Sequence, residues 1–273
     1  MVFLFYHLYP SCKYDLCPIP KNVIITITLK TNSQQQIKLS GEPLLPFVSN
    51  KDLYHHVQKV LETAQEAVDL AEENLYSNVI DPFSALFDSF RQGIKLSDWM
   101  EQEKTRQIQK TMQNALGNFH QGLLGSVPGW ESLPTGNVID VRNMKKQVMA
   151  EIKNKYNTTK GSDKKGIYDN LLSQLEGDYQ SFIGYYVEVI PKNKKPYNKT
   201  FTPSDNVTGT RRPANEKIRI IDGKSFYALV AGRDDALKML YTVLPKVIGD
   251  ILGKDHKTVI KEKLFMDLFE MAY

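Results

Sequence analysis

Cysteine is scarce in this chain. Of its 273 residues only Cys12 and Cys17 are cysteines, and both lie near the N-terminus. A single C-x4-C pair without a second pair does not match the ligand spacing of a zinc site. The body of the chain offers no disulfide framework, so we expect a protein of the reducing cytoplasm.

Long apolar runs are also absent. No stretch approaches the roughly 20 apolar residues that a membrane-spanning helix needs. The short apolar segment 1–10 lacks both the basic start and the cleavage site of a signal peptide. We therefore expect no membrane partner.

The motifs of covalent and nucleotide-driven catalysts are missing too. The chain has no G-x-S-x-G sequence and no cysteine–histidine pair in its body. The sequence Gly223-Lys224-Ser225 is not a P-loop, because Ile218 stands where that motif requires its first glycine. Any catalysis is expected to proceed without a protein nucleophile.

Positive charge is modest in total but unevenly placed. The formal net charge is +4. Residues 191–219 carry eight basic side chains and only two acids, Asp205 and Glu216, and a second basic run spans residues 145–165. Acids gather instead in residues 62–73. This asymmetry favours one face that binds a polyanion, although a solvated lysine-rich loop would have the same composition.

The order of patterns predicts a helical region followed by a sheet. Residues 1–45 differ from the rest and are predicted to be an extension of uncertain order, or else an accessory hairpin. Residues 46–273 are predicted to form one catalytic domain with an N-terminal helical region, residues 46–125. Apolar spacing predicts helices over residues 53–71, 81–92 and 96–116, and clustered Gly, Pro and Ser predict loops over residues 117–136.

The second half of the chain mixes strands and helices. We expect strands over residues 182–190, 218–221 and 225–230, the last two joined by a turn at Asp222-Gly223. Ser162 or Asp163 is expected to cap a helix over residues 167–175, and residues 236–252 and 258–271 are expected to be amphipathic helices. The order indicates an α/β fold, bordering on α+β, with a central mixed sheet flanked by helices.

The most informative pattern is DVRNMKKQVMAEIKNKYN, residues 140–157. Residues 148–152 suit a strand core, and alternate side chains of a strand share a face, so Glu151 and Lys153 point the same way. Asp140 ends a second apolar run, and a turn through Arg142 and Asn143 would bring that strand end beside Glu151. Two carboxylates and a lysine at one sheet edge suit a divalent metal, a phosphodiester and an activated water.

Two alternatives stay open from the residues alone. Most E-x-K triplets are solvated salt-bridge positions rather than catalytic ones. Asp81, which follows Val79-Ile80 and precedes Pro82, is either a further acid at the metal site or a helix N-cap.

Several separate segments resemble one family, the type II restriction endonucleases that cut GGNCC-type sites. The resemblance rests on residues 150–171 (AEIKNKYNTTKGSDKKGIYDNL), 185–192 (YYVEVIPK), 197–206 (YNKTFTPSDN) and 218–232 (IRIIDGKSFYALVAG). Residues 45–61 and 78–90 fit the same family. The resemblance extends from about residue 45 to the C-terminus.

The resemblance implies a PD-(D/E)xK nuclease fold and Mg²⁺-dependent cleavage of double-stranded DNA. Asp140, Glu151 and Lys153 match the catalytic motif of that fold, although Ile139 replaces the usual proline. Asp140, Glu151 and the Ile152 carbonyl are then the expected metal ligands, with Asp81 as the rival acid. A palindromic site further implies a homodimer, and a restriction enzyme implies a cognate DNA methyltransferase as genetic partner.

DNA contacts are expected on both sides of the predicted active site. Three residues that follow the catalytic strand are expected to contact phosphates, namely Lys155, Asn157 and Lys160. Base-reading candidates lie further along, at Lys192, Asn198, Thr202, Ser204, Asp205, Asn206, Arg211 and Arg212. The alternatives of another kind are a repair or structure-selective nuclease and a non-catalytic DNA-binding protein of the same fold.

Overall fold

The computed structural model describes residues 42–273 except residues 78, 135 and 206–207. The predicted extension, residues 1–45, lies outside the described residues apart from its last four. Within the described part, no helix is both long and apolar enough to cross a bilayer.

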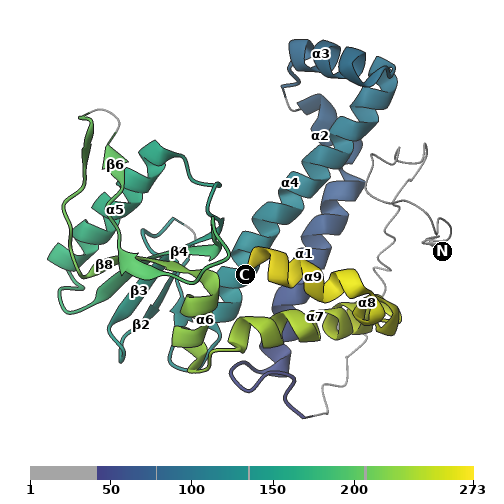
Figure 1. Cartoon of the computed structure of the whole chain (residues 1–273). Coiled ribbons are helices and arrows are strands. Elements are labelled where there is room, and N and C mark those ends of the chain that lie inside the picture. Colours follow the sequence, from purple (N-terminus) through teal and green to yellow (C-terminus); the bar gives the residue numbers. More distant parts are fainter. Residues whose placement is uncertain (1–41, 78, 135, 206–207) are drawn as a thin grey trace. The chain divides into compact units, whose positions relative to one another are not determined.

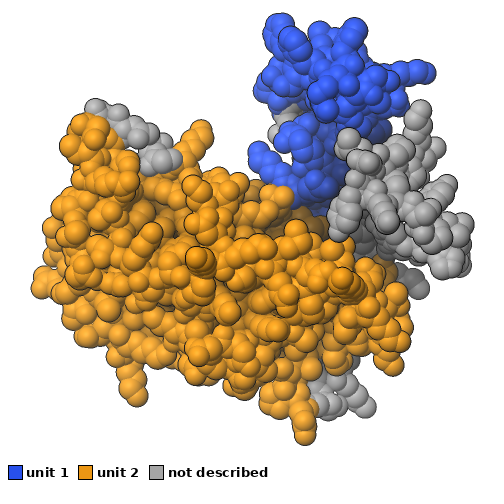
Figure 2. Space-filling model, in the orientation of Figure 1, with its two compact units in different colours: residues 1–35, 62–111 blue, residues 36–61, 112–273 orange. Residues whose placement is uncertain are grey.

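The described residues fall into two compact units, coloured separately in Figure 2. Unit 1 contains residues 62–111 and unit 2 contains residues 42–61 and 112–273. Unit 1 is helical, with the end of α1 (Asn50–Asp69), α2 (Ala71–Ser77), α3 (Pro82–Gln92) and the beginning of α4 (Leu96–Gly125). That residues 46–273 act as one catalytic domain stays a prediction.

Helix α4 is longer than the sequence pattern indicated. The predicted loop over residues 117–136 is wrong in its first part, because the helix continues to Gly125. Phe119, Leu123 and Leu124 recur at helical spacing and are buried in the core of unit 2. Burial of these side chains outweighs the low helix propensity of Gly117 and Gly122.

A six-stranded mixed sheet forms the centre of unit 2 (Figure 1). Its strand order is β1-β2-β3-β4-β8-β5, with β3, β4 and β8 parallel to one another and the remaining pairs antiparallel. The strands are β1 (Glu131–Ser132), β2 (Val141–Asn143), β3 (Val148–Lys155), β4 (Ile183–Ile190), β8 (Ile218–Asp222) and β5 (Asn198–Thr200). A separate two-stranded hairpin joins β6 (Ser204–Asp205) to β7 (Thr210–Arg211).

Helices cover both faces of the sheet. One face, with Met149 and Tyr186, packs against α5 (Gly161–Glu176). The other face, with Ala150 and Val187, packs against α4, α6 (Gly223–Ala231) and α7 (Ala236–Leu252). Alternate residues of each central strand therefore belong to different cores. The expected α/β fold with a central mixed sheet flanked by helices is confirmed.

The predicted strand over residues 225–230 is wrong, since these residues belong to helix α6. Asp222 ends β8, and its carboxylate accepts a hydrogen bond from the Ser225 amide at 3.0 Å, which caps the helix. The buried residues Gly223, Phe226, Tyr227 and Val230 then follow helical spacing. Gly223 is required where α6 meets β4, because a β-carbon there would lie 2.2 Å from the Val189 carbonyl oxygen.

Of the remaining predicted helices, one forms with the predicted bounds and two differ. The helix predicted over residues 236–252 is α7, with the bounds expected. The helix predicted over residues 258–271 is divided into α8 (Lys257–Lys261) and α9 (Lys263–Ala272), because Glu262 adopts an extended conformation. Lys160, not Ser162 or Asp163, is the N-cap of α5, and it makes no side-chain cap.

Candidate active site

Asp140 lies immediately before β2, and its carboxylate reaches along the edge of β3. The prediction that Asp140 ends a strand is wrong, as is the turn through Arg142 and Asn143. These two residues belong to β2, and the turn follows at residues 144–147. The Asp140 amide donates to the Ala150 carbonyl at 2.9 Å, and its Oδ2 accepts from the Ile152 amide at 2.6 Å. The carboxylate thus extends the ladder beyond the last residue pair of the two strands.

Glu151 and Lys153 project from β3 on the face that α5 covers. Lys153 Nζ lies 2.6 Å from Glu151 Oε1, and the two side chains are 34% and 15% exposed. The Glu151 carboxyl also hydrogen-bonds to that of Asp140. The structure therefore brings Asp140, Glu151 and Lys153 together, as the sequence pattern predicted. The solvated salt-bridge alternative does not describe Glu151, because most of its side chain is buried.

Burial makes the negative charge of this pair costly. Desolvation, followed by the charge of Asp140, raises the pKa of Glu151 to about 7, and the Lys153 ammonium opposes the change. Desolvation also raises the pKa of Asp140, against the hydrogen bond from Ile152. Two carboxylates in one partly desolvated place retain a proton unless a cation compensates their charge. A divalent cation bound by both carboxylates would compensate that charge.

The ligand set fits a hard divalent ion. Mg²⁺ takes oxygen ligands, keeps several waters and needs only one or two carboxylates from a protein. Asp140 and Glu151 supply the carboxylates, and the Ile152 carbonyl oxygen follows Glu151 directly on β3. Among the described residues, three or more His, Cys, Asp or Glu side chains do not gather anywhere in a metal-binding arrangement. A bound ion would therefore depend on these two carboxylates, the Ile152 carbonyl and water.

Asp81 performs the other role considered for it. Its carboxylate accepts from the Phe83 and Ser84 amides at 2.9 and 3.3 Å and from the Ser84 hydroxyl at 2.9 Å. It is the N-cap of α3, in unit 1. These hydrogen bonds lower the pKa of Asp81. Because the cap already engages both oxygens, we do not include Asp81 in the proposed metal site.

A second acid–lysine pair lies beside the first and was missed in the sequence. Glu188 on β4 is in register with Lys153 on β3 and is only 4% exposed. It accepts from Lys164 Nζ at 2.6 Å and from the Tyr197 hydroxyl at 2.5 Å. The available signal was an acid in the otherwise apolar strand YYVEVI, the same kind of signal that identified Glu151.

Gln121 is another residue that sequence reasoning missed. Its side-chain amide lies 3.5 Å from the carbonyl oxygen of Ile152, which is the proposed third metal ligand. Gln121 lies in the part of α4 for which a loop was predicted. Only the extended helix brings this side chain to the sheet, so no local pattern could have identified it.

The expected phosphate contacts follow β3 directly. Lys155 is the last residue of β3 and is half-buried, while Asn157 and Lys160 are exposed in the connection to α5. Lys192, expected above among the base-reading candidates, is also exposed, just after β4. These four side chains are placed as solvent-facing donors in unit 2.

The expected base-reading residues divide into exposed and internally bonded groups. Ser204 and Arg211 are exposed on the β6–β7 hairpin, and Thr202 is half-buried, with its carbonyl accepting from Arg211 at 3.0 Å. Asn198 is exposed on β5 and accepts from Arg219 at 2.7 Å. Asn206 lies outside the described residues.

Asp205 and Arg212 belong to an ion-pair network that joins the hairpin to α5. Asp205 is buried and lies 2.9 Å from Lys165 and 3.6 Å from Arg212. Arg212 also bonds to Asp169 of α5 at 2.7 Å. These bonds hold β6 and β7 against the helix.

Comparison with known proteins decides the family. The model of the Eco47II restriction endonuclease family matches residues 45–253. The chain belongs to the Eco47II restriction endonuclease family. The predicted membership of a type II restriction endonuclease family is thus confirmed, and the chain is a site-specific DNA nuclease.

Two relatives in this family cover most of the chain. The type II restriction enzyme Eco47II of Escherichia coli is 40% identical over 238 residues, which are 84% of this chain and 99% of the relative. The type II restriction enzyme Sau96I of Staphylococcus aureus is 31% identical over 235 residues, 84% of this chain and 89% of the relative. The matched span includes the whole acid–lysine cluster.

Proposed function

We propose that this Eco47II-family enzyme hydrolyses both strands of duplex DNA at a GGNCC-type palindrome, with Mg²⁺ held by Asp140 and Glu151. The cluster of Asp140, Glu151 and Lys153 at the β2–β3 edge carries the proposal. It combines two desolvated carboxylates with an ammonium group, and no protein nucleophile is needed beside it.

Each residue of the cluster has a distinct role in the proposed reaction. Asp140 and Glu151 hold the ion through carboxylate oxygens, and the Ile152 carbonyl adds a third ligand. When bound, Mg²⁺ screens the phosphate charge and lowers the pKa of a coordinated water. Lys153 orients the attacking water and stabilises the charge that develops on the phosphate oxygens.

The bond changes are those of a direct hydrolysis. The water oxygen forms a bond to phosphorus while the bond from phosphorus to the leaving sugar oxygen breaks. The attacking water loses a proton to solvent, and the leaving oxygen takes up a proton. Lys153, next to Glu151, acts through its charge.

The proposed DNA contacts follow from the place of each residue in the chain. Lys155, Asn157, Lys160 and Lys192 are proposed phosphate contacts, because they follow the strands that bear the two acids. Ser204 and Arg211 are proposed to face the bases, together with Asn198, Thr202 and Asn206, and Arg can pair with guanine O6 and N7. Asp205 and Arg212 are proposed to hold the hairpin in place for this task.

The cellular role follows from the activity. An enzyme that cuts a short palindrome would also cut the host genome, so we infer a cognate methyltransferase that protects those sites. The enzyme would act in the cytoplasm against foreign DNA. A palindrome must be cut once in each strand, and the described part of each chain holds one such cluster, so we infer a homodimer.

A plasmid digest tests the proposal. Supercoiled plasmid with several GGNCC sites is incubated with Mg²⁺ and the wild-type enzyme, Glu151→Gln or Lys153→Met. We expect discrete fragments from the wild type alone, and retained binding of a cognate duplex by both variants in Ca²⁺. The control Glu131→Gln removes a carboxylate that is 49% exposed and pairs with Arg142, and should cut normally.

The same digest separates the alternatives. Nicking confined to flaps or damaged sites would indicate a structure-selective nuclease, and binding without any cleavage would indicate a non-catalytic protein. Cleavage by Glu151→Gln at the wild-type rate would refute the assigned active site.

A further inference from the structure

Helix α3 presents an apolar face to solvent. Phe83, Phe87 and Phe90 are 71%, 79% and 85% exposed, and Leu86 is 46% exposed. The spacing 83, 86, 87 and 90 places all four side chains on one face of the helix. We refer to these four residues as the α3 patch.

The opposite face of α3 is firmly attached within unit 1. Ala85 and Ser89 are buried, Asp81 caps the first turn and Gly93 terminates the helix in a left-handed conformation. Asp88 accepts from the indole of Trp99 at 3.3 Å. The helix is therefore anchored through one side while its aromatic side remains uncovered.

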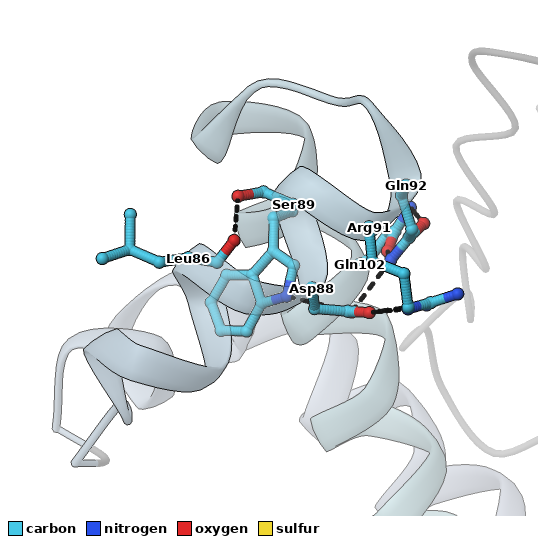
Figure 3. A network of polar contacts seen from close by, with 7 residues as sticks. Leu86, Asp88, Ser89, Arg91, Gln92 and Gln102 are labelled. Atoms are coloured by element: carbon cyan, nitrogen blue, oxygen red, sulfur yellow. Dashed lines mark hydrogen bonds and ion pairs between the residues drawn. The ribbon is translucent and has the colours of Figure 1, made fainter.

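Figure 3 shows the polar contacts of α3 together with Leu86 of the α3 patch. The side chains of Gln92 and Gln102 join α3 to α4 through a hydrogen bond of 3.1 Å, and Leu86 points away from these polar contacts. The α3 patch thus lies on a helix whose other side already makes the contacts with unit 1.

We propose that the α3 patch is the contact between two copies of this chain. This inference rests on the proposed cleavage of both strands, which requires two Asp140–Glu151–Lys153 clusters. Packed on each other about a two-fold axis in antiparallel orientation, two α3 helices place Phe83 of each copy against Phe90 of the other, with Phe87 near the axis. Such an isologous contact needs only one self-complementary patch.

The area available agrees with a stable contact. At about 200 Å² for each aromatic side chain, the patch exposes roughly 550 Å² of apolar surface per copy. A pair would bury about 1,100 Å² before any polar rim is counted, close to the lower end of specific interfaces, about 1,200 Å².

The comparisons favour a second copy over a segment of the extension. The α3 patch lies within residues 45–253, the span of the family match. The Escherichia coli relative is matched over 99% of its length by 84% of this chain, so most of the extension has no counterpart in it. A contact needed for double-strand cleavage belongs in the shared span.

Helix α9 offers the rival surface and supplies the matched control. Leu264, Leu268 and Met271 are also exposed on one helical face, whereas Phe265 between them is buried against Tyr241. This face lies beyond the span of the family match. It is also less aromatic than the α3 patch, and aromatic anchors dominate interface energies.

Sedimentation of the full chain without DNA tests the contact. We expect the wild type to be a dimer and Phe87→Glu/Phe90→Glu to dissociate, with a dimer dissociation constant raised about 100-fold or more, because each copy loses two anchors and gains like charges. The control Leu264→Glu/Leu268→Glu should remain dimeric. Circular dichroism should show the same helix content in all three.

Three outcomes would overturn the proposal: a monomeric wild type at tens of micromolar, a dimeric α3 variant, or dissociation of the α9 variant alone.

A crosslink provides a second measurement in a Cys12→Ser/Cys17→Ser background, which removes all native cysteines. There Phe87→Cys should form an intermolecular disulfide much faster than Met271→Cys. Equal or reversed rates would contradict the contact. Because neither measurement uses DNA, the contact can stand even if the plasmid digest refutes the proposed nuclease site.

Discussion

Two neighbouring strands of the sheet each carry an acid paired with a lysine, and the two pairs differ in their surroundings. Glu151 on β3 is partly exposed, faces a second carboxylate and has its pKa raised to about 7. Glu188 on β4 is buried and accepts from both Lys164 and Tyr197. The first pair holds excess negative charge that a cation would neutralise. The second is already satisfied by protein groups, so it suits a structural role.

The largest expected effect concerns the first pair. Glu151→Gln should lower the cleavage rate about 10³-fold or more, since a group that acts on the reacting phosphate is lost. Its unfolding free energy without metal should change by no more than about 1 kcal/mol or increase, because a desolvated charge beside Asp140 disappears. Rates from single-turnover digests and thermal unfolding together measure the two parts. A large loss of stability would mean that Glu151 is structural, like Glu188.

For the second pair, Glu188 and Lys164, we expect a large effect on stability. Glu188→Gln leaves Lys164 and Tyr197 without their charged acceptor and should cost about 2–4 kcal/mol of unfolding free energy. The double variant Glu188→Gln/Lys164→Met should cost less than the sum of the single variants, because it leaves no unpaired ammonium. Denaturant unfolding measures both. Additive losses would show that the two side chains do not depend on each other.

A third polar group, half-buried on the opposite face of the sheet, makes stability depend on pH. Burial lowers the pKa of His120 to about 4, and its Nδ1 lies 2.8 Å from the Tyr227 hydroxyl. The folded state therefore keeps this ring neutral where the unfolded state protonates it. Stability from this group is complete above about pH 6.5 and falls by up to about 3 kcal/mol as the pH drops to 4.

Variants isolate this contribution. His120→Gln should unfold with a flatter dependence on pH between 6.5 and 4 than the wild type, whereas the exposed His55→Gln should not differ from the wild type. The measurement is the unfolding midpoint across that range. Equal slopes for His120→Gln and the wild type would show that His120 takes up its proton in the folded state.

The smallest effect is expected outside both pairs. Lys160→Ala removes an exposed ammonium that follows the catalytic strand, and it should weaken binding to all duplexes by a similar factor, about 2- to 10-fold at moderate salt. The slope of log affinity against log salt should fall by about 1. Titration of a cognate and a scrambled duplex in Ca²⁺ checks both. A loss confined to the cognate duplex would place Lys160 at a base.

Strong periodic patterns allowed much of the fold to be predicted. Residues 236–252 alternate apolar and polar positions at helical spacing, and the helix forms with those bounds. The secondary structure of residues 225–230 could not be predicted in this way, because a short apolar segment fits a strand or a buried helix equally well. The capping bond from Asp222 to Ser225 decides for a helix, and it depends on where β8 ends. Likewise, α4 continues past Gly117 only because tertiary burial favours it.

The candidate site was predictable where charge interrupts an apolar strand. Glu151 and Lys153 were found by that rule, and Glu188 obeys it as well but lacks an E-x-K triplet around it. Asp140 was placed beside Glu151 correctly although its strand was not, since β2 begins after it. Gln121 and Lys164 are brought close only by packing of α4 and α5, and their own neighbours in sequence carry no sign of it.

The hydrogen bond from the Ile152 amide to Asp140 affects which substitutions can inactivate the enzyme without unfolding it. A carboxylate that also completes the sheet edge cannot be replaced by a short apolar side chain without exposing an amide that has no acceptor. Inactivating changes at position 140 should therefore tend to yield poorly folded chains, apart from Asp140→Asn, whose amide oxygen still accepts. Changes at Glu151 leave the edge intact and should yield stable proteins that still bind DNA. A host without the protecting methyltransferase is harmed by an active nuclease and would select inactive variants. Substitutions at position 151 are therefore expected to give an inactive enzyme that still folds.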